Sequence, residues 1–353
     1  MLNSGGVNTT IFLQGSDALA IDINKKATDL FSLLQRFDAS GLAIIAEYKD
    51  YFIHHHLGPR LFFSLQNSAH IIYCSVQQSG KAVHETQFID YGAGLGTLYM
   101  LAGMMGFKKT VYNDYLPDWQ HTAQSICAAL QIKIDAWVTG DIDAVMQHAK
   151  EHGIRYDIVA SRNVLEHIYR LPDFYAAVFK HNPSAVTYST TTANYHNPVM
   201  NWYHIYIHQQ TEKKYYRQQR REEILKLQPL LPDQQLKELI AHTRGKGQQD
   251  FIDAVNNFVN NKPIAKDSSL RSNTCDCING VWTEHLLTKK EHGEMIEAAG
   301  FKMQFTAGYW DTHYSSGLKN GMATSFNKII TLLGMERGIV LSPFVNVMAY
   351  SPV

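Results

Sequence analysis

Three glycines alternate in a short turn that could bring the backbone close to a ligand. Gly92, Gly94 and Gly96 belong to the segment Asp90-Tyr91-Gly92-Ala93-Gly94-Leu95-Gly96, which begins at the end of the predicted strand 87–91. A dinucleotide site has the spacing G-x-G-x-x-G, and Thr97 occupies the position of its third glycine here. The spacing therefore favours close backbone contact with a ligand that lacks a pyrophosphate.

Two further carboxylates follow predicted strands. Asp114 ends the predicted strand 110–114, and Asp141 follows the predicted strand 136–139 after Gly140. A carboxylate has two acceptor oxygens, which match the two neighbouring hydroxyls of a ribose. Asp141 can accept from the amino group of an adenine while the N–H of Ile142 donates to the ring. Because open α/β sheets bind ligands at the carboxyl ends of their strands, we expect both residues near the glycine turn.

The elements that must position these residues alternate between strand and helix. From residue 81 on, short apolar runs are separated by helical segments, which predicts a parallel sheet with helices on both faces. The predicted strands are 87–91, 110–114, 136–139, 156–160, 185–188, 301–305 and 345–350, and the predicted helices are 98–105, 117–130 and 290–299.

Taken in this order, the motifs resemble the class I S-adenosylmethionine-dependent methyltransferases. Residues 90–96 look like the first motif of that family, and Asp114 is similar to its acidic second-strand position. The further matching segments are Gly140-Asp141, residues 156–168 with the string Val164-Leu165-Glu166-His167-Ile168, and residues 297–302. The resemblance covers residues 87–189 and 282–353.

The resemblance implies an α/β fold, a doubly wound and mostly parallel seven-stranded sheet of the Rossmann-like methyltransferase kind, with its last strand inserted antiparallel. It implies S-adenosyl-L-methionine as the cofactor. Gly92 and Gly94 would line its methionyl portion, while Asp90 and the backbone around Ser161 and Arg162 would hold its amino group. The complete implied cofactor set is Asp90, Gly92, Gly94, Gly96, Asp114, Asp141, Ile142, Ser161 and Arg162. For each aspartate taken alone, strand-end capping is the alternative.

Two segments extend beyond the shared core. Residues 1–80 form a helical extension, expected to act as a substrate lid, in which residues 1 to 24 read as a loosely structured lead-in and a helix begins at Ala27. Residues 193–280 form a polar, largely helical insertion or cap. The cofactor-binding part of the core spans residues 81–192, and its C-terminal part spans residues 281–353.

We expect transfer of a methyl group to an oxygen or nitrogen of a small molecule. Displacement at a sulfonium is in line, so the enzyme mainly supplies alignment and desolvation. His167, with Glu166 beside it, is the candidate proton acceptor, and packing of His167 under the sheet edge is the alternative. The candidate substrate contacts are Tyr195, His196, Trp202 and Tyr203, with Trp310 at a second edge after the sixth strand. For most of the aromatic residues that follow the fifth strand, we expect packing of the insertion onto the core. The alternatives are a peptide, protein or RNA acceptor, and a non-catalytic binding protein.

Charge and composition limit the partners. The chain has 32 Lys and Arg residues against 32 Asp and Glu residues, which argues against a nucleic-acid partner. The one basic run, 213–221, reads as a solvated helix face. No apolar run reaches the length of a membrane helix and the first residues show no signal-peptide pattern, so we expect a cytoplasmic protein without membrane contact. The oligomeric state stays open.

No metal site is expected from the sequence. Cys275 and Cys277 are separated by one residue and followed by His285. The cysteines of a structural zinc site are usually at least two residues apart, so these two are too close. The three histidines at 54–56 are neighbours on a predicted helix, so they cannot all face one ion. They are better explained as the end of that helix, where its dipole favours cations.

Overall fold

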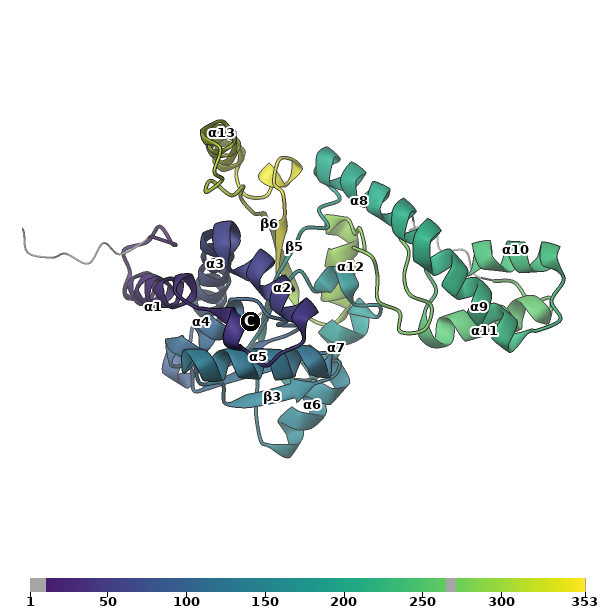
Figure 1. Cartoon of the computed structure of the whole chain (residues 1–353), viewed down its shortest axis with the longest axis horizontal. Coiled ribbons are helices and arrows are strands. Elements are labelled where there is room, and N and C mark those ends of the chain that lie inside the picture. The colour runs from purple at the N-terminus through teal and green to yellow at the C-terminus, as the bar shows by residue number, and fades with distance from the viewer. Residues whose placement is uncertain (1–10, 265–270, 353) are drawn as a thin grey trace, which may run out of the picture.

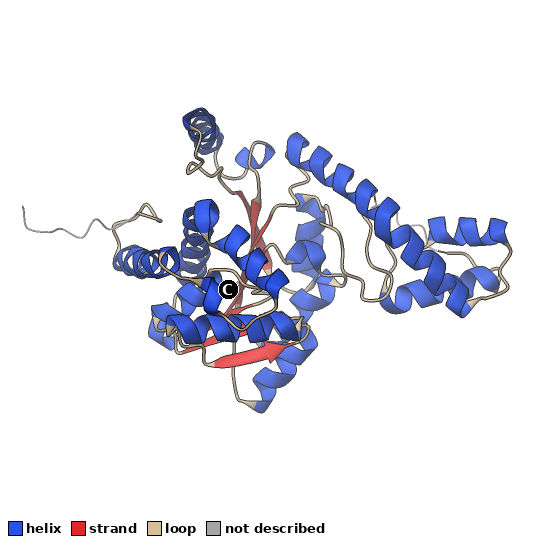
Figure 2. Cartoon of the chain, in the orientation of Figure 1, coloured by secondary structure: helices blue, strands red, loops and turns tan. Residues whose placement is uncertain are grey.

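The computed structural model describes residues 11–264 and 271–352, and its centre is a seven-stranded sheet (Figure 1, Figure 2). The strand order is β3-β2-β1-β4-β5-β7-β6. All pairings are parallel except those of β7, which lies antiparallel between β5 and β6. The strands are β1 (Gln87–Asp90), β2 (Lys109–Asp114), β3 (Ala136–Thr139), β4 (Ile158–Arg162), β5 (Val186–Thr191), β6 (Lys302–Ala307) and β7 (Val345–Tyr350). The predicted fold class is confirmed.

Alternating strand residues feed two separate cores, because successive side chains of a strand point to opposite faces. Phe88 and Ile158 belong to one core, whereas their chain neighbours Ile89 and Val159 belong to the other. The first core is covered by α1 (Ala18–Gln35), α3 (Leu61–Ser79), α4 (Leu98–Met105) and α5 (Pro117–Leu130). The second is covered by α6 (Ile142–Glu151), α7 (Leu171–His181), α12 (Lys289–Ala298) and part of α13 (Gly317–Leu333).

The N-terminal extension is more helical than its sequence pattern predicts. Helix α1 begins at Ala18, ahead of the predicted Ala27, because the Asp17 side chain caps it by accepting a hydrogen bond from the Ala20 N–H at 3.0 Å. The early part of the predicted lead-in, residues 1–10, lies outside the described residues. Helix α2 (Ala46–His56) carries the three consecutive histidines in its last turn, as predicted. Helix α3 packs directly on β4 and β5, so this part of the extension is a layer of the core.

The insertion is helical, as expected, and extends away from the sheet (Figure 1). Its helices are α8 (Pro198–Thr211), α9 (Arg217–Leu227), α10 (Asp233–His242) and α11 (Gln248–Val259), and a π-helical turn, Glu212–Tyr216, joins α8 to α9. Ile224, Leu239 and Val255 are at the centre of a small apolar core that is separate from the two cores beside the sheet. No helix among the described residues has the length and apolar character that crossing a bilayer requires.

A buried ion pair joins the π-helical turn to α9, and a hydrogen bond ties it to the segment that follows the helices of the insertion. Arg220 is only 1% exposed and donates to both carboxylate oxygens of Glu212, with 3.2 Å between Nη1 and Oε2. Thr274 also donates to that carboxylate, at 2.7 Å. Burial acts to raise the pKa of Glu212, but the hydrogen bonds and charge of Arg220 hold that pKa below its usual value.

Replacing Arg220 with Ala should therefore unfold the insertion before the core. The change leaves the Glu212 carboxylate buried without its cation, which typically costs about 3–5 kcal/mol. Hydrogen exchange should show faster exchange in α9 to α11 while the amides of β1 and β4 stay protected. Arg221→Ala, at the exposed neighbouring position, is the control and should leave exchange unchanged. Equal protection of the insertion in the Arg220 and Arg221 variants would contradict this role of the ion pair.

Candidate functional site

The site lies where the strand order reverses, between β1 and β4. Asp90 ends β1 and is 2% exposed, and its Oδ2 atom is buried without a hydrogen-bond partner. Burial raises the pKa of Asp90 well above its usual value; the charge of Asp114 adds to this, and that of Arg162 opposes it. A buried, unpaired carboxylate oxygen is costly. Asp90 is therefore positioned to accept from a cationic or N–H-bearing ligand.

The glycine turn after β1 has a backbone that other residues rarely adopt. Gly92 and Gly94 have φ angles of 67° and 52°, in the left-handed region. A Cβ atom on Gly92 would lie 2.7 Å from the side chain of Val164, and one on Gly94 would lie 3.0 Å from the Trp119 ring. The turn therefore needs glycine at both positions for its conformation and for the close approach of its neighbours.

Asp114 is held against this turn by the backbone. Its Oδ2 accepts from the N–H of Gly94 at 2.9 Å and its Oδ1 accepts from the N–H of Leu116 at 3.0 Å. Burial raises the pKa of Asp114, and these backbone donors counteract the rise. Each carboxylate oxygen has room for a second donor, so Asp114 can still accept from a ligand at the edge of the sheet.

Asp141 and Ile142 lie farther along the same edge. Asp141 is exposed and caps α6, accepting from the N–H groups of Asp143 and Ala144 through Oδ1 at 3.1 and 3.2 Å. Ile142 is the first residue of that helix. The capping alternative considered for Asp141 is thus realised, and its contact with an adenine stays a prediction.

Ser161 and Arg162 end β4. The Ser161 hydroxyl is buried and forms a hydrogen bond with the Ser189 hydroxyl at 2.7 Å, so its side chain is used inside the sheet. The Arg162 guanidinium reaches α3, where it donates to Ser64 Oγ at 2.6 Å. Because a guanidinium carries five N–H donors, this bond leaves others for an anionic group.

Helix α2 covers the turn, and sequence reasoning did not identify its contacts there. His56 lies beside Gly96, with a ring carbon 3.9 Å from the position that a Cβ atom of Gly96 would occupy, and its Nδ1 atom is buried without a partner. The Tyr51 ring packs edge-on against Trp119, with 4.9 Å between ring centres. The helix-end interpretation of residues 54–56 was right, but no sequence signal indicated which ring would turn inward.

Glu166 and His167 lie together in a short 3-10 turn after β4, Leu165–His167. The structure adds a residue that the sequence did not single out, Glu284, whose carboxylate approaches them. Burial raises the pKa of Glu166 to about 7, and the charge of Glu284 acts in the same direction. The roles of Glu166 and His167 in proton transfer stay predictions.

The structure does not gather the five candidate substrate residues into one pocket. Trp202 and Tyr203 are exposed on α8, at 68% and 49%. Tyr195 lies against the Arg271 guanidinium, and the Nε2 of His196 accepts from the N–H of Lys289 at 2.9 Å. Trp310 donates from Nε1 to the carbonyl of Leu341 at 2.8 Å. These contacts match the packing alternative, and the substrate assignment stays a prediction.

Two features that were set aside in the sequence have structural roles. Cys275 and Cys277 are free and buried, and Cys277 packs in the small core of the insertion. Within the basic run, Arg220 forms the buried ion pair, whereas Lys213, Lys214, Arg217 and Arg221 are exposed. The solvated-face interpretation thus holds for the run except at Arg220.

No protein-family model and no curated protein sequence matches the chain. Similar solved structures exist. A putative methyltransferase from Bacillus halodurans is 13% identical with a TM-score of 0.42, over 81% of this chain and 99% of that one. A phosphoethanolamine N-methyltransferase 2 from Haemonchus contortus, in complex with S-adenosyl-L-methionine, is 10% identical with a TM-score of 0.37, over 88% of this chain and 61% of that one.

A third structure, an S-adenosylmethionine-dependent methyltransferase from Clostridium acetobutylicum, is 15% identical with a TM-score of 0.32. That match covers 41% of this chain and 58% of the other, so the chain matches just over half the length of that neighbour. The strand order, with its antiparallel β7, rather than these scores, carries the fold assignment.

Lowering the pH should weaken the packing of α2 on the glycine turn. Burial, with the charges of Arg162 and His55, lowers the pKa of His56 from 6.5 to about 3. The unfolded chain therefore binds a proton at His56 below pH 6.5 that the folded chain does not bind. The stability that neutral His56 contributes is complete above pH 6.5 and is lost as the pH falls toward 3.

Urea unfolding at about pH 7.5 and about pH 5 measures this effect, because stability rises with pH wherever the unfolded state binds more protons. His56→Gln should show a smaller loss of unfolding free energy at the lower pH than the unmodified chain shows. His54→Gln, at an exposed position on the same helix, should keep the full loss. An unchanged loss in His56→Gln would contradict the assignment.

Proposed function

We propose that this chain, whose fold is that of the class I S-adenosylmethionine-dependent methyltransferases, is itself such an enzyme and methylates an oxygen or nitrogen of a small molecule. One observation carries the proposal: the unpaired, buried carboxylate oxygen of Asp90 lies at the strand-order reversal, beside a turn whose two glycines cannot be replaced without strain. An amino-acid ligand without a phosphate fits this combination.

The residues at the reversal fit the methionine end of the cofactor. Its ammonium group would be a donor for Asp90, whose Oδ2 lacks one. Its carboxylate would accept from the guanidinium of Arg162, the cation whose charge acts on Asp90. Gly92 and Gly94 allow the backbone to approach the chain between these groups and the sulfur.

The nucleoside end of the cofactor fits the carboxyl ends of β2 and β3. Asp114 is fixed by two backbone donors and keeps acceptor capacity on both oxygens, which suits the two hydroxyls of a ribose. Asp141 and the N–H of Ile142 stand at the start of α6, where an adenine can bind edge-on. Asp90, Asp114 and Asp141 thus follow three neighbouring strands, β1, β2 and β3, in spatial order.

The bound cofactor supplies a methyl group on a sulfonium, which is already a good leaving group. What the protein contributes is alignment of the acceptor and exclusion of water. Helix α2 places His56 and Tyr51 over the glycine turn and Trp119, so the site is covered on that side. A covered site is easier for a small molecule to enter than for a protein or RNA chain, so this cover favours a small acceptor.

Replacing Asp114 with Ala should weaken the binding of S-adenosyl-L-methionine by about 10- to 100-fold, because hydrogen bonds to a charged acceptor contribute roughly 1.5–3 kcal/mol. Asp114→Asn keeps the shape and one acceptor oxygen, so it should lose less. Isothermal titration measures both. Asp118→Ala, an exposed carboxylate on α5, is the control. If the Asp114→Ala variant binds as tightly as the unmodified chain, the ribose assignment is wrong.

Release of S-adenosyl-L-homocysteine should be detectable with a panel of small hydroxyl- and amine-bearing molecules. Peptides and RNA serve as competing acceptors in the same assay. Turnover with peptides or RNA alone would show that the acceptor is not a small molecule. Cofactor binding without turnover on any acceptor would favour a non-catalytic binding protein, since a fold does not establish an activity.

A further inference from the structure

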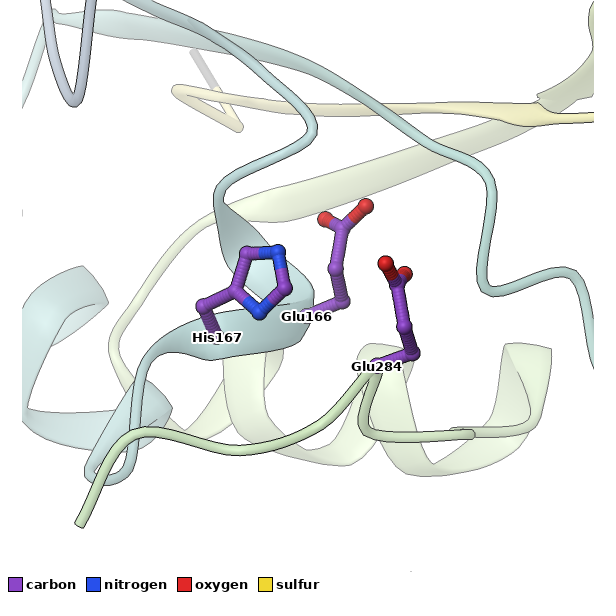
Figure 3. Close-up of side chains that lie close together, drawn as sticks. All are labelled: Glu166, His167 and Glu284. Atoms are coloured by element: carbon purple, nitrogen blue, oxygen red, sulfur yellow. The ribbon is translucent and has the colours of Figure 1, made fainter. Parts of the chain in front are cut away.

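Three side chains from two distant segments meet beyond the end of β4. Glu166 and His167 come from the turn after that strand, and Glu284 comes from the loop that precedes α12. One potential ligand atom from each lies within 4.8 Å of the other two. Figure 3 shows the two carboxyl groups beside each other, with a ring nitrogen of His167 turned toward Glu166.

The carboxyl groups lack the partners that burial demands. Glu166 is 2% exposed, and both of its carboxyl oxygens are buried without a hydrogen-bond partner. The hydroxyl of Thr191 lies near Glu166 but outside ordinary hydrogen-bonding geometry. One oxygen of Glu284 is also buried and unpartnered. Buried carboxylates are normally paired or bound to a metal, so a cation would satisfy this pair.

The imidazole of His167 is oriented as that of a metal-binding histidine would be. Its Nδ1 atom lies 2.9 Å from the carbonyl oxygen of Trp282, which can only accept, so Nδ1 carries the proton. The lone pair of neutral His167 is therefore on Nε2. A histidine that binds a metal usually donates its other N–H to a carbonyl or carboxylate in this way.

Backbone hydrogen bonds hold the two segments together. The N–H of His285 donates to the carbonyl of Glu166 at 2.8 Å. The N–H of Trp282 donates to the carbonyl of His167 at 3.3 Å. His208, from α8, donates to the carbonyl of Glu284 at 3.0 Å. Glu284 has a φ angle of 52°, which is rare for a residue other than glycine, and such strain clusters at functional sites.

We propose that Glu166, His167 and Glu284 form a binding site for one divalent first-row transition-metal ion, such as Mn²⁺, Co²⁺ or Zn²⁺. One imidazole nitrogen and two carboxylates suit these ions, whereas Mg²⁺ and Ca²⁺ prefer oxygen ligands alone. A dication balances the charge of the two carboxylates. With bonds of about 2.1 Å the ligand atoms would be roughly 3.4 Å apart in a tetrahedral site, so small side-chain rotations complete the set.

The site leaves at least one coordination position open, because three protein ligands do not complete the shell of such an ion. It also differs from the sequence-based expectation of no metal. Ligation uses the only free lone pair of neutral His167, on Nε2, so His167 cannot accept a proton while it binds the metal. The claim concerns metal binding only and does not depend on the proposed methyl transfer.

Titration of the chelator-treated full chain with MnCl₂, CoCl₂ or ZnCl₂ tests the site by calorimetry. We expect one ion per chain, and visible absorption of the Co²⁺ form characteristic of nitrogen and oxygen ligands. Glu166→Gln, Glu284→Gln and His167→Asn should each weaken binding by at least about tenfold, since even the loss of an outer-shell partner costs 10–100-fold.

Two controls separate this site from incidental binding. Glu297→Gln, an exposed carboxylate on α12, should bind as the unmodified chain does. A His54→Asn, His55→Asn double variant removes the exposed histidines of α2 and should also keep the site. Thermal unfolding without metal checks that each variant folds.

Absence of stoichiometric binding for all three ions would overturn the proposal. So would a folded Glu166→Gln variant that binds as tightly as the unmodified chain, or loss of binding in the His54, His55 double variant alone. Because S-adenosyl-L-methionine affinity is measured separately, failure of the metal site and failure of the proposed function are distinguishable.

Discussion

The reversal of strand order between β1 and β4 is the constraint on which the rest of the site depends. The connections from these two strands turn to opposite sides, so the space beyond their carboxyl ends is not filled by a crossover. Asp90 and Arg162 end those strands, and the glycine turn must pass through the same space. The fold thereby holds a buried carboxylate oxygen without a partner. A ligand with a cationic group offsets that cost.

The N-terminal helices serve both the core and the site. Helix α3 packs on β4 and β5, and its Ser64 receives the guanidinium of Arg162. Helix α2, one short connection earlier, places His56 beside the glycine turn. Because one continuous segment covers the sheet and the site, a change that loosens α3 will also move the groups that face the ligand.

The insertion joins the core near the Glu166–Glu284 pair. Two histidines one turn apart on α8 make these contacts. His208 bonds to the carbonyl of Glu284, in the loop before α12, and His204 bonds to the carbonyl of Thr192, just after β5. The position of Glu284, one of the proposed metal ligands, therefore depends on the insertion. This gives the insertion a structural link to the core outside its own small apolar core.

The sequence by itself determined the strands and their mostly parallel arrangement. Helices 98–105 and 117–130 and the strands 136–139 and 345–350 agree with the structure residue for residue, because their periodicity and flanking glycines or prolines are local signals. The early start of α1 was missed because its cap, Asp17, precedes the apolar pattern. Helix α13 was missed as well, since much of its apolar face is exposed and no core pattern marks it.

Only the tertiary structure decided which side chains meet. The proximity of Glu284 to Glu166, and of His56 to Gly96, joins segments far apart in the chain, and no local pattern records such a contact. The same holds for the partners of Tyr195, His196 and Trp310, which are Arg271, the N–H of Lys289 and the carbonyl of Leu341. Backbone propensity is encoded over a few neighbouring residues, whereas a site is assembled by the packing of elements across the whole fold.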